Sequence, residues 1–182
     1  MAVKVKVKLL DDNAEHPYRS HPSDTGYDIK FTSVKKVVGD VIFFGTGVSL
    51  QPSQNYYFEI VPRSSISKHS LGLANSVGVI DNQYTGEIMI PIRVFHRHQG
   101  GVAGKDSRFP SGLMTIFDTK VTSIGDVANL ILKKKPYMCQ LILRKRLNAE
   151  FVSYEDLEDT ERGDGGFGST GDTRSDNESS PE

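Results

Sequence analysis

Near its C-terminus the chain carries a glycine-rich run, Arg162–Gly171, with the residue types that bind nucleotides. Its glycines let backbone N–H groups approach an anion closely. Arg162, Ser169 and Thr170 supply further donors for phosphate oxygens. Phe167 offers a flat apolar face on which a base can stack. A flexible terminal linker has a similar composition, and the run lacks the Lys-Ser/Thr pair of a Walker A loop. Other segments must therefore decide whether the run binds a nucleotide.

A second segment, Gly78–Glu87, joins two apolar runs through a polar turn. If Asp81 is held at the base of a hairpin, its carboxylate can orient and deprotonate a water molecule. Tyr84, in the same turn, can pack its ring against a sugar. An ordinary turn also favours an Asp-Asn pair for its local hydrogen bonds, so this segment is ambiguous when taken alone.

Two further segments contain residues that suit phosphate and a metal ion. Pro62–His69 combines a cation with three hydroxyl groups at the expected start of a short helix, where serine is also an ordinary cap. Asp24–Ile29 places two carboxylates around a glycine turn. Asp28 can hold a water bound to Mg²⁺, an ion that keeps several of its waters, and an Asx-turn is the alternative interpretation.

The composition is that of an ordinary one-domain protein, with 182 residues and a formal net charge of −1. This charge gives no electrostatic reason to expect a nucleic-acid polymer or a membrane surface as partner. We expect neither export nor a membrane span, because the sequence has no signal-like start and no long apolar run. Cys139 is the only cysteine, which excludes an intrachain disulfide and suits a reducing compartment.

The elements that must position these residues are expected to be short β-strands. Residues 3–9 alternate apolar and basic side chains with period two. Similar β-rich runs follow at 37–44, 56–61, 87–95, 113–117 and 141–147. Only 64–73 is expected to be helical, for about one to three turns. Many short strands at regular spacing favour an all-β sandwich or barrel and argue against βαβ units.

The end of the chain differs from the part before it. The last core strand is expected around 151–154, so the glycine-rich run lies on an arm beyond the core. Residues 172–182 have no aliphatic side chain and cannot offset the entropy lost on ordering, so we expect them to be disordered. An arm of this kind can reach a site on a neighbouring subunit.

In their order along the chain, these segments resemble the motifs of the trimeric dUTPases, enzymes that hydrolyse dUTP to dUMP and pyrophosphate. Thr25–Ile29 resembles the first motif, Pro62–Ser65 the second, Gly78–Glu87 the third and Arg162–Gly171 the fifth. Each motif is weak by itself, but four in the order of the family are specific. The resemblance spans about residues 3–171, nearly all of the foldable chain.

Three features depart from the pattern of that family. Ser65 stands where the second motif usually has glycine, which makes the approach to phosphate tighter. The fourth motif usually reads Gly-acidic-basic-Ile-Ala-Gln, and here only Gln140 and the aliphatic residues after it remain. The spacing from Asp81 to Gln140 exceeds that of compact members, which places an insertion at about 99–132. We expect a surface excursion there, because loops tolerate insertions at little cost.

The resemblance implies a distorted jelly roll or β-barrel with a C-terminal glycine-rich arm. We expect a β-barrel domain over 1–152, an arm that acts as a lid over 153–171 and a tail over 172–182. The resemblance also implies a homotrimer with active sites at the subunit interfaces. The expected partner is the dUTP substrate rather than a nucleic-acid polymer or a membrane. The expected location is the cytoplasm, or the nucleus if the source is a eukaryote or its virus.

The resemblance also implies roles for individual residues. Asp81 would be the general base, and Asp28 would reach one Mg²⁺ through water. Arg63 would support the geometry around Asp81 and the phosphates. The side chains expected on phosphate oxygens are Ser64, Ser65 and Gln140. The remaining expected contacts, to uracil, deoxyribose and the closed lid, are Asn75, Val79, Ile80, Tyr84, Met89, Arg162, Phe167, Gly168, Ser169 and Thr170. Hydrolysis of dUTP would limit uracil in DNA and supply dUMP for dTMP synthesis.

Two other functions fit part of the pattern. A dCTP deaminase shares the fold, and its zinc-dependent form is excluded because Cys139 is the only thiol available beside His96 and His98. A zinc-free deaminase would release ammonia from dCTP. A regulatory relative would use the nucleotide pocket as a switch and the insertion as a partner surface, although the intact Asp81 and the complete arm argue against lost catalysis.

Overall fold

The computed structural model describes residues 2–95, 114–121, 123–155, 157–161 and 163–165. Its contacts divide the chain into two compact units, Met1–Leu147 and Asn148–Glu182. The assigned helices and strands all belong to the first unit. Among the described residues, no helix is both long and apolar enough to cross a membrane.

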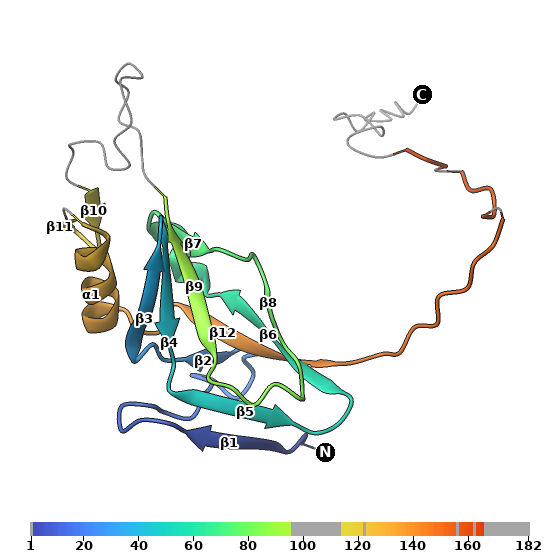
Figure 1. The fold of residues 1–182 in the computed structure, drawn as a ribbon, viewed down its shortest axis with the longest axis horizontal. Coiled ribbons are helices and arrows are strands. Elements are labelled where there is room, and N and C mark those ends of the chain that lie inside the picture. Colours follow the sequence, from blue (N-terminus) through green and yellow to red (C-terminus); the bar gives the residue numbers. More distant parts are fainter. Residues whose placement is uncertain (1, 96–113, 122, 156, 162, 166–182) are drawn as a thin grey trace, which may run out of the picture. The chain divides into compact units, whose positions relative to one another are not determined.

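Two four-stranded antiparallel sheets form most of the first unit (Figure 1). One has the strand order β2-β12-β6-β8, with bounds Tyr27–Ile29, Cys139–Lys145, Tyr56–Pro62 and Gly78–Ile80. The other has the order β3-β4-β9-β7, with bounds Ser33–Val38, Val41–Gly45, Met89–Val94 and Leu71–Leu73. Two antiparallel pairs complete the strands, β1 (Val5–Leu9) with β5 (Val48–Pro52) and β10 (Met114–Ile116) with β11 (Thr119–Val121). The expected all-β, jelly-roll-like fold is confirmed.

A hydrophobic core cluster draws on strands of both sheets. On β9, Ile90, Ile92 and Val94 are buried and alternate with less buried neighbours, which is the period of a strand with one face in the core. Phe31 and Phe44 stack with 4.7 Å between their ring centroids. Burying one such side chain stabilises the fold by about 1.5–3 kcal/mol, so a one-residue slip of β9 would be strongly disfavoured.

Among the described residues, helical structure occurs in two places, and only one was expected. The 3₁₀ turn η1 (Ser64–Lys68) lies within the predicted helical range. The helix α1 (Ile124–Lys134) was not predicted. The expectation that only 64–73 would be helical was therefore wrong. A capping box between Ser123 and Asp126 starts α1, and Val127 and Ile131, one turn apart, are buried.

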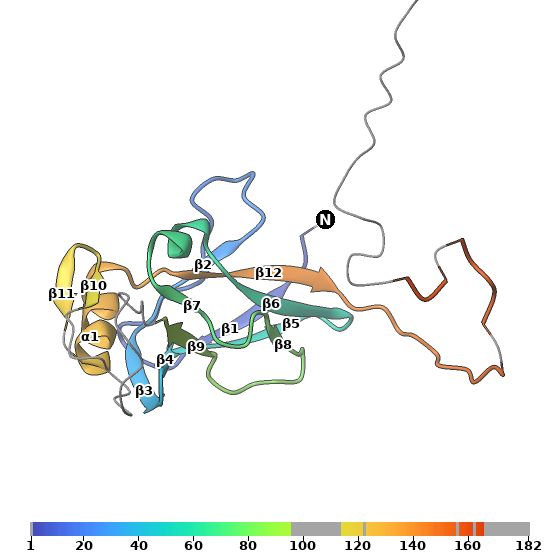
Figure 2. The same ribbon diagram turned by 90° about the horizontal axis from the view of Figure 1, so that it is seen from above.

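The described part of the expected insertion is not merely a surface loop. Its buried residues join the same hydrophobic cluster as the two sheets, and they are Ile116, Val121, Val127, Ala128 and Ile131. The strands β10 and β11 and the helix α1 lie side by side in both views (Figures 1 and 2). The first part of the insertion falls outside the described residues.

Two strand predictions need correction. The single run expected at 37–44 is a hairpin of β3 and β4, because the chain turns at Gly39, whose φ is 59°. The strand expected at 151–154 is absent: Phe151 is 97 % exposed, and the last strand is β12. The described residues of the second unit form neither helix nor strand. The expected tail at 172–182 lies outside the described residues.

Candidate active site

The first group of candidate residues is assembled by the pairing of β2, β12 and β6. Asp28 on β2 lies opposite Gln140 on β12, and Gln140 lies opposite Val61 on β6. Arg63 follows the end of β6, and its Nη1 is 3.0 Å from Oδ2 of Asp28. Residues far apart in the sequence thus meet at one end of the sheet. We call Asp28, Arg63 and Gln140 the phosphate-side cluster.

The Asp28 carboxylate is almost removed from solvent, with 8 % of its side chain exposed. Burial raises its pKa above the ordinary value, the Arg63 guanidinium opposes that shift, and the nearby Asp24 charge adds to it. The Arg63 guanidinium, whose side chain remains 36 % exposed, therefore stabilises the ionised form of Asp28.

Arg63 and Gln140 also connect the neighbouring backbone segments. Arg63 donates from Nη1 to the carbonyl of Tyr137 at 3.3 Å and from its backbone N–H to Met138 at 2.9 Å. Gln140 Nε2 donates to the carbonyl of Pro62 at 3.3 Å. Gly26 passes so close that an added Cβ would lie 1.9 Å from Oε1 of Gln140, so a larger residue there would displace the Gln140 amide. Sequence analysis gave no separate role to Gly26.

Ser64 and Ser65 begin η1 directly after Arg63, and both are exposed. Arg63 is the N-cap residue of η1, and its side chain makes no capping hydrogen bond. Ser67 donates its hydroxyl to the carbonyl of Ser64 at 2.7 Å, which steadies the turn. The two serine hydroxyls therefore face solvent beside the Asp28–Arg63 pair, where an anion can reach them.

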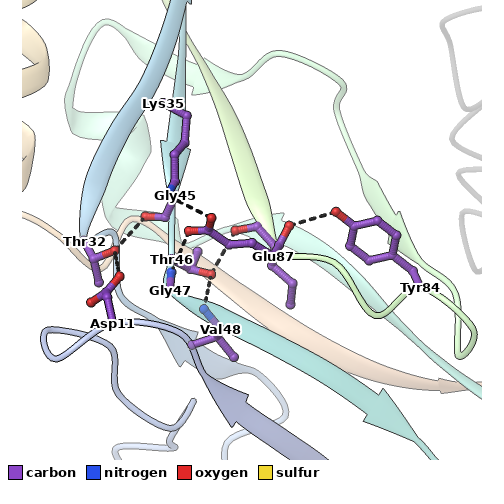
Figure 3. A network of polar contacts seen from close by, with 10 residues as sticks. Asp11, Thr32, Lys35, Gly45, Thr46, Gly47, Val48, Tyr84 and Glu87 are labelled. Carbon is purple, nitrogen blue, oxygen red and sulfur yellow. Dashed lines mark hydrogen bonds and ion pairs between the residues drawn. The ribbon is translucent and has the colours of Figure 1, made fainter.

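The second group lies on the loop Asp81–Glu87 after β8. Asp81 is exposed, and its backbone carbonyl accepts from the N–H of Tyr84 at 3.1 Å. The Tyr84 ring is 42 % exposed, and its hydroxyl donates to the carbonyl of Glu87 at 2.8 Å (Figure 3). At Gly86 an added Cβ would lie 2.6 Å from that hydroxyl, so a larger residue there would displace the Tyr84 ring. We call Asp81–Glu87 the base loop.

The base loop is not the hairpin that we expected. β8 pairs with β6 in one sheet, whereas β9 pairs with β4 and β7 in the other. The loop therefore crosses from one sheet to the other. Its ends are held by strands of different sheets.

Polar residues at the corner between β4 and β5 hold the base loop in place (Figure 3). Glu87 Oε1 accepts the N–H of Gly47 at 2.9 Å, and its Oε2 lies 2.8 Å from Nζ of Lys35. Ser49 donates its hydroxyl to the carbonyl of Thr85 at 2.7 Å, and Thr46 donates to the carbonyl of Ile88 at 2.9 Å. Sequence analysis missed Glu87 and Ser49 as supporting residues. The polar turn Gly45-Thr46-Gly47 was the available signal.

The residues expected to read the base surround β8. In the part of the chain that the structure describes, β8 pairs only with β6 and is an edge strand, so one row of its backbone groups is open to a ligand. Val79 is 60 % exposed, Ile80 is half-buried, and Met89 at the start of β9 is 44 % exposed. Asn75 is exposed, and its Nδ2 lies 3.4 Å from the position of a Cβ built on Gly78.

The two groups lie at opposite ends of β6. Ile80 pairs with Phe58, so Asp81 follows beside the start of β6, whereas Arg63 follows Pro62 at its end. The length of strand between these positions is roughly 20 Å, at about 3.3 Å per residue. A single chain therefore keeps the base loop apart from the phosphate-side cluster.

The expected lid residues cannot be placed. Arg162, Phe167, Gly168, Ser169 and Thr170 lie outside the described residues. Of the glycine-rich run, only 163–165 is described, and Gly163 has φ 52°, a conformation that favours glycine.

The fold and the two groups of residues define an all-β protein that presents side chains able to bind phosphate and an exposed carboxylate. The dUTPase family model matches residues 12–102 and 125–171. The chain therefore belongs to the dUTPase family, and it is an enzyme that hydrolyses dUTP. The family model leaves 103–124 unmatched, a span that lies within the range given above for the insertion.

Individual relatives agree with this assignment. Deoxyuridine 5′-triphosphate nucleotidohydrolase from Leptospira interrogans is 33 % identical, over 93 % of this chain and 99 % of its own length. The enzyme of the same name from Clostridium acetobutylicum is 31 % identical, over 93 % of this chain and 97 % of its own. The solved Staphylococcus bacteriophage 80alpha dUTPase with dUPNHPP has a TM-score of 0.67 at 25 % identity, over 92 % of this chain and 98 % of that one.

Proposed function

We propose that the chain hydrolyses dUTP by attack of water on the α-phosphorus, with Asp81 as general base. The water oxygen bonds to the α-phosphorus, the bond to the bridging oxygen of the β-phosphate breaks, and Asp81 takes the proton. The products are dUMP and pyrophosphate. One observation carries this proposal, the exposed Asp81 on a loop held by Glu87 and Ser49. A positioned base contributes about 10²–10⁴-fold to the rate.

The phosphate-side cluster and the start of η1 bind the triphosphate in this proposal. The exposed hydroxyls of Ser64 and Ser65 donate to its oxygens. Gln140 donates one amide N–H to the carbonyl of Pro62, and its second amide N–H remains available for a phosphate oxygen. Arg63 acts as a positioning residue, because its guanidinium holds Asp28 and the Tyr137 carbonyl. Orientation and charge neutralisation supply most of the remaining acceleration.

One Mg²⁺ bound to the triphosphate fits this cluster, with Asp28 reaching the ion through water. Carboxylate oxygen is the ligand type that Mg²⁺ prefers, and the ion commonly keeps several waters. The Arg63 guanidinium already neutralises Asp28, which favours this indirect contact over direct ligation. No group of three or more His, Cys, Asp or Glu side chains in the described part of the chain could hold a metal by itself. When bound, the ion would neutralise phosphate charge. The dUTPase of phage phi11, 22 % identical with a TM-score of 0.60, has been described with a structural Mg(II) ion in a mutant form.

Selection of deoxyuridine would take place at β8 and the base loop. The open backbone edge at Val79 and Ile80, with the Asn75 amide, can pair with the polar edge of uracil. The half-exposed Tyr84 ring would lie under the deoxyribose and leave no space for a 2′-hydroxyl. Met89 would line the same pocket.

We infer a homotrimer in which each active site combines residues of different subunits. The separation of Asp81 and Arg63 along β6 supports this inference, because a triphosphate near Arg63 of one chain needs the base loop of another. The glycine-rich arm, with Arg162, Phe167, Gly168, Ser169 and Thr170, would close over the bound nucleotide. Phe167 would stack on the uracil while the polar residues cover the phosphates.

In a cell, this activity would limit uracil in DNA and supply dUMP for dTMP synthesis. The cytoplasm, where nucleotide pools are kept, is the expected location, and the buried free thiol of Cys139 suits it. A regulatory second role is the alternative to weigh. Phage dUTPases among the solved relatives have been described as controlling the transfer of virulence genes.

A pyrophosphate-release assay with dUTP, dTTP, UTP and dCTP, each with and without Mg²⁺, tests the proposal. We expect release from dUTP alone and a strong dependence on Mg²⁺. Ammonia is measured in the dCTP reactions, since its release would indicate a deaminase. Equal rates with UTP and dUTP would contradict the role of Tyr84.

A further inference from the structure

A cavity of about 530 Å³ lies between η1, the β10–β11 turn and the end of α1. It is outside the base loop, and the insertion forms one of its walls. The charged and aromatic residues that line it are Lys68, His69, Phe117, Asp118, Lys134, Lys135 and Tyr137. We call this cavity the insertion pocket.

The charge of the insertion pocket favours an anion. Three lysines face it, against the single carboxylate of Asp118. Lys134 donates from Nζ to Oγ1 of Thr119 at 2.9 Å, so its ammonium is held at the wall next to β11. His69 is part-buried there, and burial together with the charges of Lys135 and Lys68 lowers its pKa, while Asp118 opposes the shift. Lys68 and Lys135 are thus close enough to His69 for their charges to reach it, and together with Lys134 they outnumber the one carboxylate at this pocket.

A tight hairpin turn forms one wall of the pocket. Phe117 and Asp118 are the two-residue turn between β10 and β11, with φ of 50° and 58°, the left-handed values that a hairpin loop of this length favours. The Phe117 ring packs edge-on against His69, with 4.2 Å between ring centroids and planes at 76°. The insertion is thereby joined to the end of η1.

The position of Ser65 relates this pocket to the catalytic reaction. Ser65 lines the insertion pocket and also belongs to the phosphate-binding turn of the proposed function. The cavity therefore adjoins the place where the triphosphate is expected. Its volume exceeds that of a single phosphate, and its lysines come from two elements, which suits an anion with charge on two linked groups.

We propose that the insertion pocket is a binding site for a diphosphate group, held by Lys68, Lys134 and Lys135. The group has two possible sources with the same chemistry, inorganic pyrophosphate and the terminal phosphates of the bound nucleotide. Only the identity of these two sources rests on the proposed function. The site itself requires no turnover by Asp81.

Calorimetric titration of the full chain with inorganic pyrophosphate tests the site. We expect saturable binding that weakens by about tenfold in Lys68→Gln and in Lys135→Gln, the range for loss of one hydrogen bond to a charged group. Lys133→Gln is the matched control, because Lys133 is an exposed neighbour on α1 that does not line the cavity. Circular dichroism checks that each variant keeps its fold.

A second titration identifies the source of the diphosphate. Pyrophosphate is added to chain saturated with a non-hydrolysable dUTP analogue. Retained binding indicates a separate pyrophosphate site. If pyrophosphate binding is lost and analogue affinity is reduced in Lys68→Gln and Lys135→Gln, the site holds the terminal phosphates of the nucleotide. If both variants match Lys133→Gln for pyrophosphate and for the analogue, the proposal is overturned, whereas failure to hydrolyse dUTP would overturn only the proposed function.

Discussion

The phosphate-side cluster and the base loop are built in opposite ways. In the cluster, the functional side chains hold one another: Asp28 is nearly buried and forms an ion pair with Arg63. In the base loop, the functional side chains of Asp81 and Tyr84 remain exposed, and supporting hydrogen bonds fix the backbone beneath them. A change in the first region should therefore affect stability and activity together. A change at the tip of the second should affect activity alone.

The largest effect is expected from Asp81→Asn. The amide cannot accept the proton of water, so turnover of dUTP should fall by about 10²–10⁴-fold while folding is unchanged. Stopped-flow pyrophosphate release measures the rate, and urea unfolding measures the stability. Asp12→Asn, at another exposed aspartate, is the control. Hydrolysis at the wild-type rate in Asp81→Asn would remove Asp81 from the mechanism.

Arg63→Ala should separate the two regions most clearly. It leaves the buried Asp28 carboxylate without its cation, which should lower the free energy of unfolding by about 1–3 kcal/mol. Turnover should fall as well, because the side-chain hydrogen bond from Arg63 to the Tyr137 carbonyl is lost. Adding Asp28→Asn should restore part of the stability, and none of the activity. If Arg63→Ala unfolds at the wild-type urea concentration, the cluster is not held by charge.

Tyr84→Phe sharpens the comparison within the base loop. It removes the hydrogen bond to the Glu87 carbonyl and keeps the ring, so stability should change by about 1 kcal/mol or less. Preference for dUTP over UTP should persist in Tyr84→Phe and be lost in Tyr84→Ala. Competition kinetics with the two nucleotides measure the preference. A preference lost in both variants would assign selection to the hydroxyl instead of the ring.

The smallest effect concerns His69 beside the insertion pocket. Its pKa is lowered in the folded chain, so its contribution to stability is present above the ordinary value near 6.5 and is lost as pH falls toward the folded value. Between about pH 7 and pH 5, the free energy of unfolding should decrease less steeply in His69→Gln than in the wild type. Urea unfolding at several pH values gives the slopes. Parallel slopes would show that burial and the neighbouring cations do not lower the pKa of His69.

Sequence analysis identified the motifs because each is a short run. It placed the first strand, β6 and β9 from their apolar patterns, and it placed η1 in a serine-rich turn. It missed α1, although Val127 and Ile131 lie at helical spacing, because that segment was taken for a loop insertion. It also predicted the last core strand around 151–154, where the apolar residues are in fact exposed on the described arm.

The sequence by itself determined the family and the residue types available for chemistry, since both depend on neighbours along the chain. Only the tertiary structure decided which of these residues meet. Asp28 finds Arg63 through the pairing of β2, β12 and β6, and Glu87 reaches Gly47 across two sheets. The same pairing keeps Asp81 and Arg63 at opposite ends of β6. Strand pairing joins residues of distant sequence position, and no local pattern encodes it.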